Sequence, residues 1–217
     1  MHCDNAAIVI GNGESRISLD IRSYWDKVTL IGCNAIHRDM RVNHLVCCDH
    51  RMVREAVNNK KVSHIYTRPR YYNDFYKVLQ KEKVKNLPAL PYEGVLKPDQ
   101  AEHWGSGPYA VLLAAELNFK NILIIGFDLY GKNTLVNNVY KGSINYLPEN
   151  KSAVDPSYWI YQMRKVFLHY SDKNFKIFNH DTWQCPEDWR LPNVEVFELD
   201  KFYTEVAKEL NTVYNKT

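Results

Sequence analysis

The sequence predicts an α/β protein in which helices flank a Rossmann-like parallel sheet. Signals for a strand, a turn and a helix follow one another repeatedly along the 217 residues. The run from Ile122 to Ile125 is wholly apolar and too short for a helix, which is typical of a strand covered on both faces. A helical pattern precedes this run and polar residues follow it. This order predicts a parallel sheet, because each helix returns the chain to the start of the next strand.

Short apolar runs predict the strands of this sheet, at residues 6–10, 28–32, 44–48, 62–66, 84–87, 122–125 and 175–178. Helical patterns predict the helices, at residues 52–59, 72–81, 106–118, 155–170 and 200–214. The helix from Ser106 has that serine as its cap and Pro108 in its first turn, where no N–H is needed. The next helix begins at Asp155 or Ser157. Residues 17–25 are expected to form a short helix or a loop.

All residues from 1 to 217 are expected to form one domain, since a chain of this length supports one good-sized core. Residues 132–156 interrupt the alternation of strands and helices. This segment is polar, rich in asparagine and contains two prolines. A segment of this length without periodicity predicts a long functional loop or a flexible lid.

The composition is that of an ordinary soluble protein, with 45% apolar and 24% charged residues. No apolar run approaches the roughly 20 residues that a membrane span needs. The start, MHCDNAAIVIGNG, has no basic region before its apolar run and predicts a strand in place of a signal peptide. The five cysteines form no C-x-x-C pair, which suits a reducing compartment, and Cys47 and Cys48 are expected to pack in the core. We therefore expect a cytoplasmic protein.

The charge is unevenly distributed, although the net charge is only +3. Residues 51–85 contain ten lysines and arginines and three acidic residues, a local balance of +7, so the remainder sums to −4. A basic segment on a nearly neutral body predicts a polyanionic partner or a phosphate-bearing ligand.

The turn after the first strand, Gly11-Asn12-Gly13-x-Ser15, resembles the start of a dinucleotide-binding turn. The spacing G-x-G-x-x-G fails because position 16 is arginine, and Asn34 stands where an acidic residue would follow the second strand. These departures disfavour a classical NAD or FAD site, and no P-loop motif is present. The glycines still permit close approach of the backbone to a phosphate or a base.

Polar side chains follow several of the predicted strands at the edge where parallel sheets bind ligands. Asn12, Asn34 and Asp49 each come directly after a strand, and an amide offers both a donor and an acceptor to a nucleobase or a ribose. The start of the 106–118 helix also offers free N–H groups to an anion. The sequence therefore predicts a nucleotide pocket, formed by Gly11, Asn12, Gly13, Ser15, Asn34, Asp49, Ser106, Gly107 and Asp128.

The ordered set of these motifs resembles the bacterial sialyltransferases of glycosyltransferase family 42. That family has a G-N-G-P-S turn, a C-N dipeptide after its second strand, an S-G-x-Y helix start and a strand ending in G-x-D-x-Y. The corresponding segments here are 11–15, 33–34, 106–109 and 126–130, in the same order over roughly residues 6–131. Pterin diphosphokinase-like proteins share the opening turn and the α/β plan.

The resemblance implies a GT-A-like variant of the fold and a role for several residues. Asn12, Gly13, Asn34 and Ser106 would hold the nucleotide, and Asp49 stands where the family uses an amide. Tyr130 would contact the leaving phosphate, since an uncharged phenol can stabilise developing charge without a metal. No D-x-D motif is present, so we expect no metal site and no required cofactor, with the nucleotide-sugar as a substrate.

The chain departs from the family at the general base. The family places a histidine in or just after the lid, whereas residues 145–160 contain none. Four groups are candidates for this role, because carboxylates and imidazoles can deprotonate a hydroxyl, namely Asp155, Glu149, His50 and His103. A second tyrosine that the family uses on phosphate has no exact counterpart, and Tyr140 is the nearest candidate.

The basic segment also interleaves aromatic and cationic side chains. Arg68, Arg70, Tyr71 and Tyr72 form a candidate acceptor surface, because stacking faces among cations suit a glycan or a nucleic-acid base, as in DNA modification. The alternative is a helix whose aromatic side chains pack inward while its lysines are solvated.

The leading prediction is a glycosyltransferase that moves a sugar from a CMP- or UDP-linked donor to a hydroxyl of a glycan or a modified DNA base. One alternative is Mg²⁺-dependent diphosphate transfer, as in the pterin diphosphokinases. Another is a non-catalytic module that binds nucleotides or nucleic acid. A homo-oligomer is compatible with each of these readings.

Overall fold

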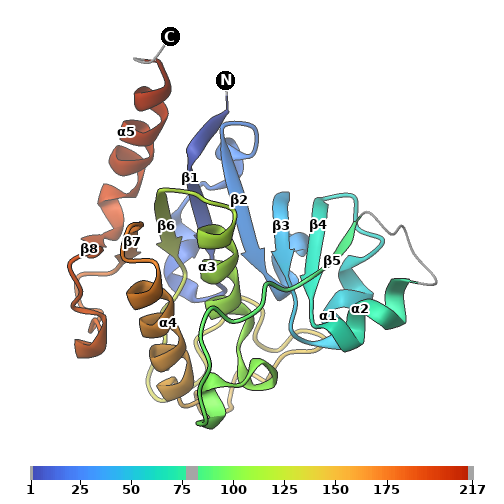
Figure 1. The fold of residues 1–217 in the computed structure, drawn as a ribbon. Coiled ribbons are helices and arrows are strands. Elements are labelled where there is room, and N and C mark those ends of the chain that lie inside the picture. The colour runs from blue at the N-terminus through green and yellow to red at the C-terminus, as the bar shows by residue number, and fades with distance from the viewer. Residues whose placement is uncertain (1, 77–82, 215–217) are drawn as a thin grey trace.

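The computed structural model describes residues 2–76 and 83–214, and within them lies one eight-stranded sheet (Figure 1). All neighbouring strands are parallel, in the order β5-β4-β3-β2-β1-β6-β7-β8. This confirms the predicted α/β class with a Rossmann-like parallel sheet. The strands are β1 (Cys3–Ile10), β2 (Val28–Cys33), β3 (Val42–Val46), β4 (Val62–Thr67), β5 (Val84–Asn86), β6 (Asn121–Ile125), β7 (Asn174–Asn179) and β8 (Val194–Glu198).

The strand order reverses beside β1. From β1 the chain builds outward to β5 on one side, and it then returns to pair β6 with the free edge of β1. Connections on the two sides of this point diverge, which leaves a crevice at the carboxyl ends of the strands where open α/β sheets bind ligands. The loops after β1 and β6 therefore meet at the site that this topology favours.

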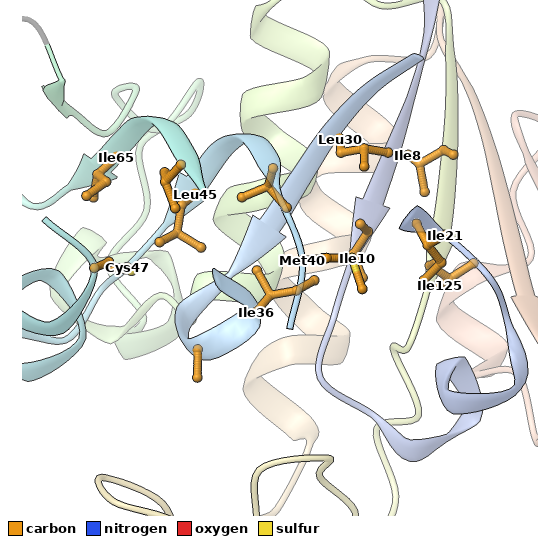
Figure 2. Close-up of a cluster of buried hydrophobic side chains, with 14 of the residues drawn as sticks. Ile8, Ile10, Ile21, Leu30, Ile36, Met40, Leu45, Cys47, Ile65 and Ile125 are labelled. Carbon is orange, nitrogen blue, oxygen red and sulfur yellow. The ribbon is translucent and has the colours of Figure 1, made fainter. Parts of the chain in front are cut away.

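Helices cover both faces of the sheet and seal two apolar cores. One core joins α3 (Ser106–Glu116) and α4 (Ser157–His169) to the sheet. The other lies under α1 (His50–Ala56) and α5 (Phe202–Tyr214), with Phe75 of α2 (Pro69–Tyr76) at its margin. Figure 2 shows side chains of this second core, where Ile8, Leu30 and Leu45 of three adjacent strands are buried on the same face. Burial on both faces explains why the strands read as continuous apolar runs.

The structure differs from the predicted elements at several points. The prediction omitted β8, and this edge strand has exposed and half-buried side chains in place of a buried run. Helix α1 begins at His50 and ends at Ala56, earlier than predicted at both ends, and α2 begins at Pro69. The predicted continuation of α2 to residue 81 lies outside the described residues. The N-cap of α3 is Gly105, and the Ser106 hydroxyl bonds elsewhere.

Residues 132–156 form a long loop that lies across the carboxyl ends of the central strands (yellow in Figure 1). Its regular pairing is limited to two isolated bridges, Lys132 with Leu135 and Leu135 with Ser152. Motion of this loop as a lid stays a prediction. Across residues 2–76 and 83–214, no helix combines the length and the apolar character that crossing a membrane requires.

Candidate functional site

A cavity of about 390 Å³ lies at the carboxyl ends of the central strands, where the strand order reverses. We call it the central cavity. Every residue of the predicted nucleotide pocket except Ser15 lines it. The chain segments after β1, β2, β3 and β6 and the start of α3 supply these residues, which are Gly11, Asn12, Gly13, Asn34, Asp49, Ser106, Gly107 and Asp128.

The loops after β1 and β6 approach each other closely because both begin with glycine. The N–H groups of Gly11 and Gly13 donate to the carbonyl oxygens of Ile125 and Gly126, each at 2.8 Å. A Cβ on Gly11 would lie 2.2 Å from the Gly126 oxygen, and Gly126 itself has φ +68°, which favours glycine. These glycines extend the pairing of β1 and β6 past the strand ends and form the floor of the central cavity.

Asp128 lines the central cavity but is bonded to the first turn. Its carboxylate accepts the Ser15 N–H at 3.0 Å and also the Ser15 hydroxyl. Asp128 is 7% exposed, and a Cβ on Gly13 would overlap its carboxylate. Asp128 and Ser15 therefore hold the shape of the turn, which is a structural contribution that the sequence did not distinguish from ligand binding.

The hydroxyl of Ser106 joins three segments of the cavity wall. It donates to Oδ1 of Asn34 at 2.9 Å and accepts the N–H of Cys48 at 3.0 Å. Asn34 has φ +49°, a left-handed conformation that asparagine tolerates better than most residues. Because Oδ1 accepts from Ser106, the amide Nδ2 is the group that Asn34 can offer to a ligand. Among the described residues no acceptor is bonded to this Nδ2.

The start of α3 adds backbone donors to the same wall. The first-turn N–H groups of Ser106 and Gly107 have no partner within the helix, and the helix dipole makes this end favourable for an anion. A Cβ on Gly107 would lie 3.1 Å from the Phe127 ring. Glycine therefore lets the Phe127 ring pack closely against the start of α3.

Asn12 connects the central cavity with the 132–156 loop. The side-chain Nδ2 of Asn12 donates to the Cys33 carbonyl at 3.2 Å and to the Tyr146 hydroxyl at 3.3 Å. The main-chain carbonyl of Asn12 accepts the Val139 N–H at 2.8 Å. The Tyr146 hydroxyl also accepts the N–H of Ala35 at 3.4 Å. The loop is thus hydrogen-bonded to the two strand ends that carry the predicted nucleotide-binding asparagines.

Tyr140, the tyrosine that the sequence suggested for the lid, anchors this loop. It is 6% exposed, its hydroxyl donates to Asp39 at 2.6 Å, and Arg16 donates to it at 3.0 Å. Burial raises the pKa of Tyr140, and the hydrogen bond to Asp39 adds to this effect. It does not line the central cavity, whereas Tyr146 contacts Asn12.

Asp49 lies on the cavity wall as the N-cap of α1. Its carboxylate accepts the Arg51 N–H at 3.0 Å and pairs with the Arg51 guanidinium at 3.1 Å. Burial opposes ionisation of Asp49, but the hydrogen bonds and charge of Arg51 outweigh it and lower the pKa. Asp49 is therefore an ionised carboxylate at the edge of the cavity.

Tyr130 lies beside the central cavity, in a smaller cavity of about 140 Å³. The two cavities share four lining residues, Leu129, Asn137, Asn138 and Trp159. Burial raises the pKa of Tyr130, and Cys185 adds to this effect. Tyr130 is thus a neutral hydrogen-bond donor at the border of the site, and its catalytic role stays a prediction.

None of the four residues predicted as candidates for the base lines the central cavity. His50 faces α2, where its ring is 3.5 Å from the Asp74 carboxylate and 5.0 Å from the Phe75 ring centroid. His103 packs edge-on against Tyr158. The Asp155 carboxylate accepts the N–H of Ser157 at the start of α4, and Glu149 is exposed on the loop near Gly142.

The predicted acceptor surface lies on and beside α2. Arg68 donates to the Trp104 carbonyl at 3.0 Å, and Arg70 stacks on Tyr71 with 4.5 Å between guanidinium and ring centroid. Phe75 is buried, and Tyr72 packs against the same core. The structure brings none of these residues to the central cavity, and Tyr72 and Phe75 pack inward, as in the alternative prediction.

Several lining residues were missed by the sequence analysis. Asn137 and Asn138 come from the loop, Trp159 and Met163 from α4, and Cys33, Cys48 and Phe127 from strand ends. The asparagine content of the loop was the available signal. The apolar members carry no signal that separates them from the core.

A metal-binding cluster was not predicted. Within residues 2–76 and 83–214, no group of three or more His, Cys, Asp and Glu side chains has an arrangement that could hold a metal ion. Metal independence of the reaction stays a prediction.

The chain has an α/β fold with a cavity at the reversal of strand order, the position where such sheets bind ligands. Among solved structures, the chain resembles the monofunctional α-2,3-sialyltransferase Cst-I from Campylobacter jejuni, with a TM-score of 0.56 and 13% identity over 98% of this chain and 96% of that one. The fold is therefore sialyltransferase-like and agrees with the GT-A-like variant that the motifs implied. Membership of glycosyltransferase family 42 stays a prediction.

Other similar structures come from the same organism. Sialyltransferase CstII in complex with the substrate analogue CMP-3FNeuAc has a TM-score of 0.47 and 14% identity, over 79% of each chain. An α-2,3-sialyltransferase in apo form has a TM-score of 0.47 and 13% identity, over 80% of this chain and 74% of that one. No protein-family model matches the sequence, and no curated protein matches it.

Proposed function

We propose that the protein is a glycosyltransferase that moves a sugar from a CMP- or UDP-linked donor to a hydroxyl of its acceptor. The observation that carries this proposal is the convergence of Asn12, Asn34 and the start of α3 on one cavity at the reversal of strand order. The likeness to Cst-I, a sialyltransferase by name, supports the class of reaction.

The nucleotide part of the donor has complementary groups on the cavity walls. The Asn34 amide, oriented by Ser106, suits the base or ribose, because its free Nδ2 is a donor. The N–H groups at the start of α3 suit the phosphate. The neutral phenol of Tyr130, in the adjoining cavity, suits the phosphate that leaves with the nucleotide.

The acceptor hydroxyl needs a base as it attacks the sugar, and Asp49 is the residue that we assign to this role. The lining of the central cavity contains two carboxylates, Asp49 and Asp128. Asp128 is buried and bonded twice to Ser15, whereas the Asp49 side chain is 46% exposed and ionised. Asp49 can therefore accept a proton without the loss of a buried contact.

A glycan acceptor agrees better with the structure than a modified DNA base. Tyr72 of α2, one of the aromatic side chains that suggested nucleic acid, packs against the core beside Phe75 and is not free to stack on a base. No contact among the described residues favours diphosphate transfer over sugar transfer.

The test is a thermal-shift panel of CMP, UDP, GDP and ATP, each with and without Mg²⁺. A ligand at about 100 times its Kd adds roughly 2.7 kcal/mol to the unfolding free energy of a protein that binds it only when folded. We expect CMP or UDP to raise Tm without metal. Stabilisation by ATP with Mg²⁺ alone would point to diphosphate transfer, and an unchanged Tm with every nucleotide would refute the nucleotide site.

The variant Asn34→Asp tests the pocket itself. Aspartate keeps the acceptor for Ser106 and tolerates the left-handed backbone, but it replaces the Nδ2 donor with a negative charge. We expect nucleotide affinity to fall by about tenfold or more, because the loss of one hydrogen bond to a charged or buried group has an effect of this size. Isothermal titration calorimetry measures this, and unchanged affinity with unchanged Tm would remove Asn34 from the site.

A further inference from the structure

A second cavity, of about 640 Å³, lies between α1 and the 132–156 loop. We call it the arginine cavity, because Arg38, Arg51 and Arg54 line it together with Glu55 and the loop residues 143–145. Arg51 and Arg54 belong to the basic segment of residues 51–85. The cavity places part of that charge next to the loop that borders the central cavity.

The loop wall of the arginine cavity is held in place by Arg38. This guanidinium forms a two-pronged pair with the Glu55 carboxylate, at 2.5 and 2.7 Å. It also donates to the Ser143 hydroxyl at 2.8 Å and to the Ile144 carbonyl at 2.9 Å. The Arg38 hydrogen bonds lower the pKa of Glu55, so the two charges balance within the wall. Arg38 is thus a structural part of the cavity.

The other two guanidiniums are available to a ligand. Arg54 has no hydrogen bond or ion pair with the part of the chain that the structure describes. Arg51 pairs with Asp49, but the two side chains are 66% and 46% exposed, and such pairs contribute little to stability. Arg51 and Arg54 lie three residues apart on α1, on neighbouring positions of a helix face. Two adjacent cations favour an anion between them.

The opposite wall offers groups that suit a sugar. The Asn145 amide donates from Nδ2 to Glu55 at 3.3 Å, which leaves its Oδ1 as an acceptor for a hydroxyl. The Ile144 side chain is 79% exposed and presents an apolar surface beside the arginines. A guanidinium pair, a hydroxyl acceptor and an apolar face together match a saccharide that carries an acidic group.

One ion pair and one loop contribute residues to both the arginine cavity and the central cavity. Asp49 lines the central cavity, and its partner Arg51 lines the arginine cavity. The 132–156 loop supplies Asn137 to one cavity and Asn145 to the other. A molecule in the arginine cavity would therefore border Asp49, which we assigned as the base.

We propose that the arginine cavity binds a carboxylate or phosphate group of the acceptor, so that the acceptor is an anionic saccharide. The role of this ligand as the acceptor rests on the proposed sugar transfer, whereas the binding of an anion in the arginine cavity does not. Arg54 is the residue on which the recognition of the anion depends most, because no protein carboxylate competes for it among the described residues.

The test uses four soluble probes, glucose 6-phosphate, glucuronate, neutral glucose and oligothymidylate, titrated into the full chain at low ionic strength with calorimetric detection. We expect one or both anionic sugars to bind and glucose to bind far more weakly. The variant Arg54→Gln should weaken the anionic sugar about tenfold, the usual effect of losing one charge-assisted hydrogen bond. The tighter of the two probes identifies phosphate or carboxylate as the group recognised.

The matched control is Arg22→Gln, which removes the same charge from another exposed arginine that lines neither the arginine cavity nor the central cavity. Its affinity for the anionic sugars should stay as in the wild type. Equal weakening in both variants, no binding of either anionic sugar, or a preference for oligothymidylate over the sugars would overturn the proposal. The nucleotide panel on the same proteins reports separately on the central cavity, so failure of one site does not obscure the other.

Discussion

Asp49→Asn is expected to lower the rate of sugar transfer by about a hundredfold or more, which is the usual contribution of a general base. The amide cannot accept the proton of the acceptor hydroxyl. Asparagine is as good an N-cap as aspartate, so the hydrogen bond from the Arg51 N–H can persist and α1 should remain intact. Initial rates at saturating donor and acceptor measure the effect.

Two further measurements distinguish a loss of catalysis from a loss of folding in this variant. Nucleotide-induced stabilisation should persist, because the change leaves Asn34, Ser106 and the start of α3 as they are. The rate of the wild type should fall in acid, as the Asp49 carboxylate is protonated, and this acid limb should be absent in the variant. A rate within twofold of the wild type would exclude Asp49 as the base.

Lys176→Met is expected to lower the free energy of unfolding by about 3 kcal/mol. Lys176 of β7 lies beneath α5, where its ammonium is 2.9 Å from the Glu205 carboxylate and 3.1 Å from that of Glu209. These two glutamates are 5% and 7% exposed. Removal of one partner of a buried pair leaves uncompensated charge, which typically costs 3–5 kcal/mol, and here Lys208 continues to pair with Glu205.

The pH dependence of this effect has a defined sign. Hydrogen bonds from Lys208 and then Lys176 lower the pKa of Glu205 from its ordinary value of 4.5. A carboxyl whose pKa is lowered in the folded state contributes stability above its unfolded pKa and loses it as pH falls through the lowered value. The difference in stability between wild type and Lys176→Met should therefore be full near neutral pH and shrink below about pH 4.5. Urea denaturation at several pH values measures it.

An exposed pair provides the control. Lys201→Met removes a partner of Asp200, but these side chains are 57% and 65% exposed, so the change should cost under about 0.5 kcal/mol. Adding Glu209→Gln to Lys176→Met should restore part of the lost stability, because it removes one of the unpaired charges. If the double variant is no more stable than Lys176→Met, packing and not charge accounts for the loss.

The sheet was largely predictable because its strands are buried on both faces. Runs such as residues 122–125 are too short for a helix and are typical of strands covered on both faces, and their spacing implies parallel connections. The edge strand β8 was missed because Val194–Glu198 is not buried in this way, and only the alternation of valine with charged residues marks it. The end of α1 was placed too late because helical propensity alone does not mark where a helix ends.

Several lining residues of the central cavity were predictable for a related reason. Asn12, Asn34 and Asp49 follow strands, and parallel strands end at one edge, so topology brings them together. The four residues that the sequence suggested as the base lie on loops and at helix ends, where sequence position does not indicate which way a side chain points. His50 turns toward Phe75 of α2, and this orientation depends on packing that arises only in the folded chain. The arginine cavity escaped prediction because its two walls are about 90 residues apart.

The hydroxyl of Ser106 is hydrogen-bonded to Asn34 and to Cys48, which lie 72 and 58 residues before it in the chain. No local segment can therefore preform the central cavity, since β2, β3 and α3 must all be docked before Asn34 is oriented. Such long-range closure arises late in folding, because loop entropy opposes it until the sheet is in place. A ligand of this cavity would thus discriminate the native state from partly folded forms, and its occupancy would report the integrity of the whole centre of the sheet.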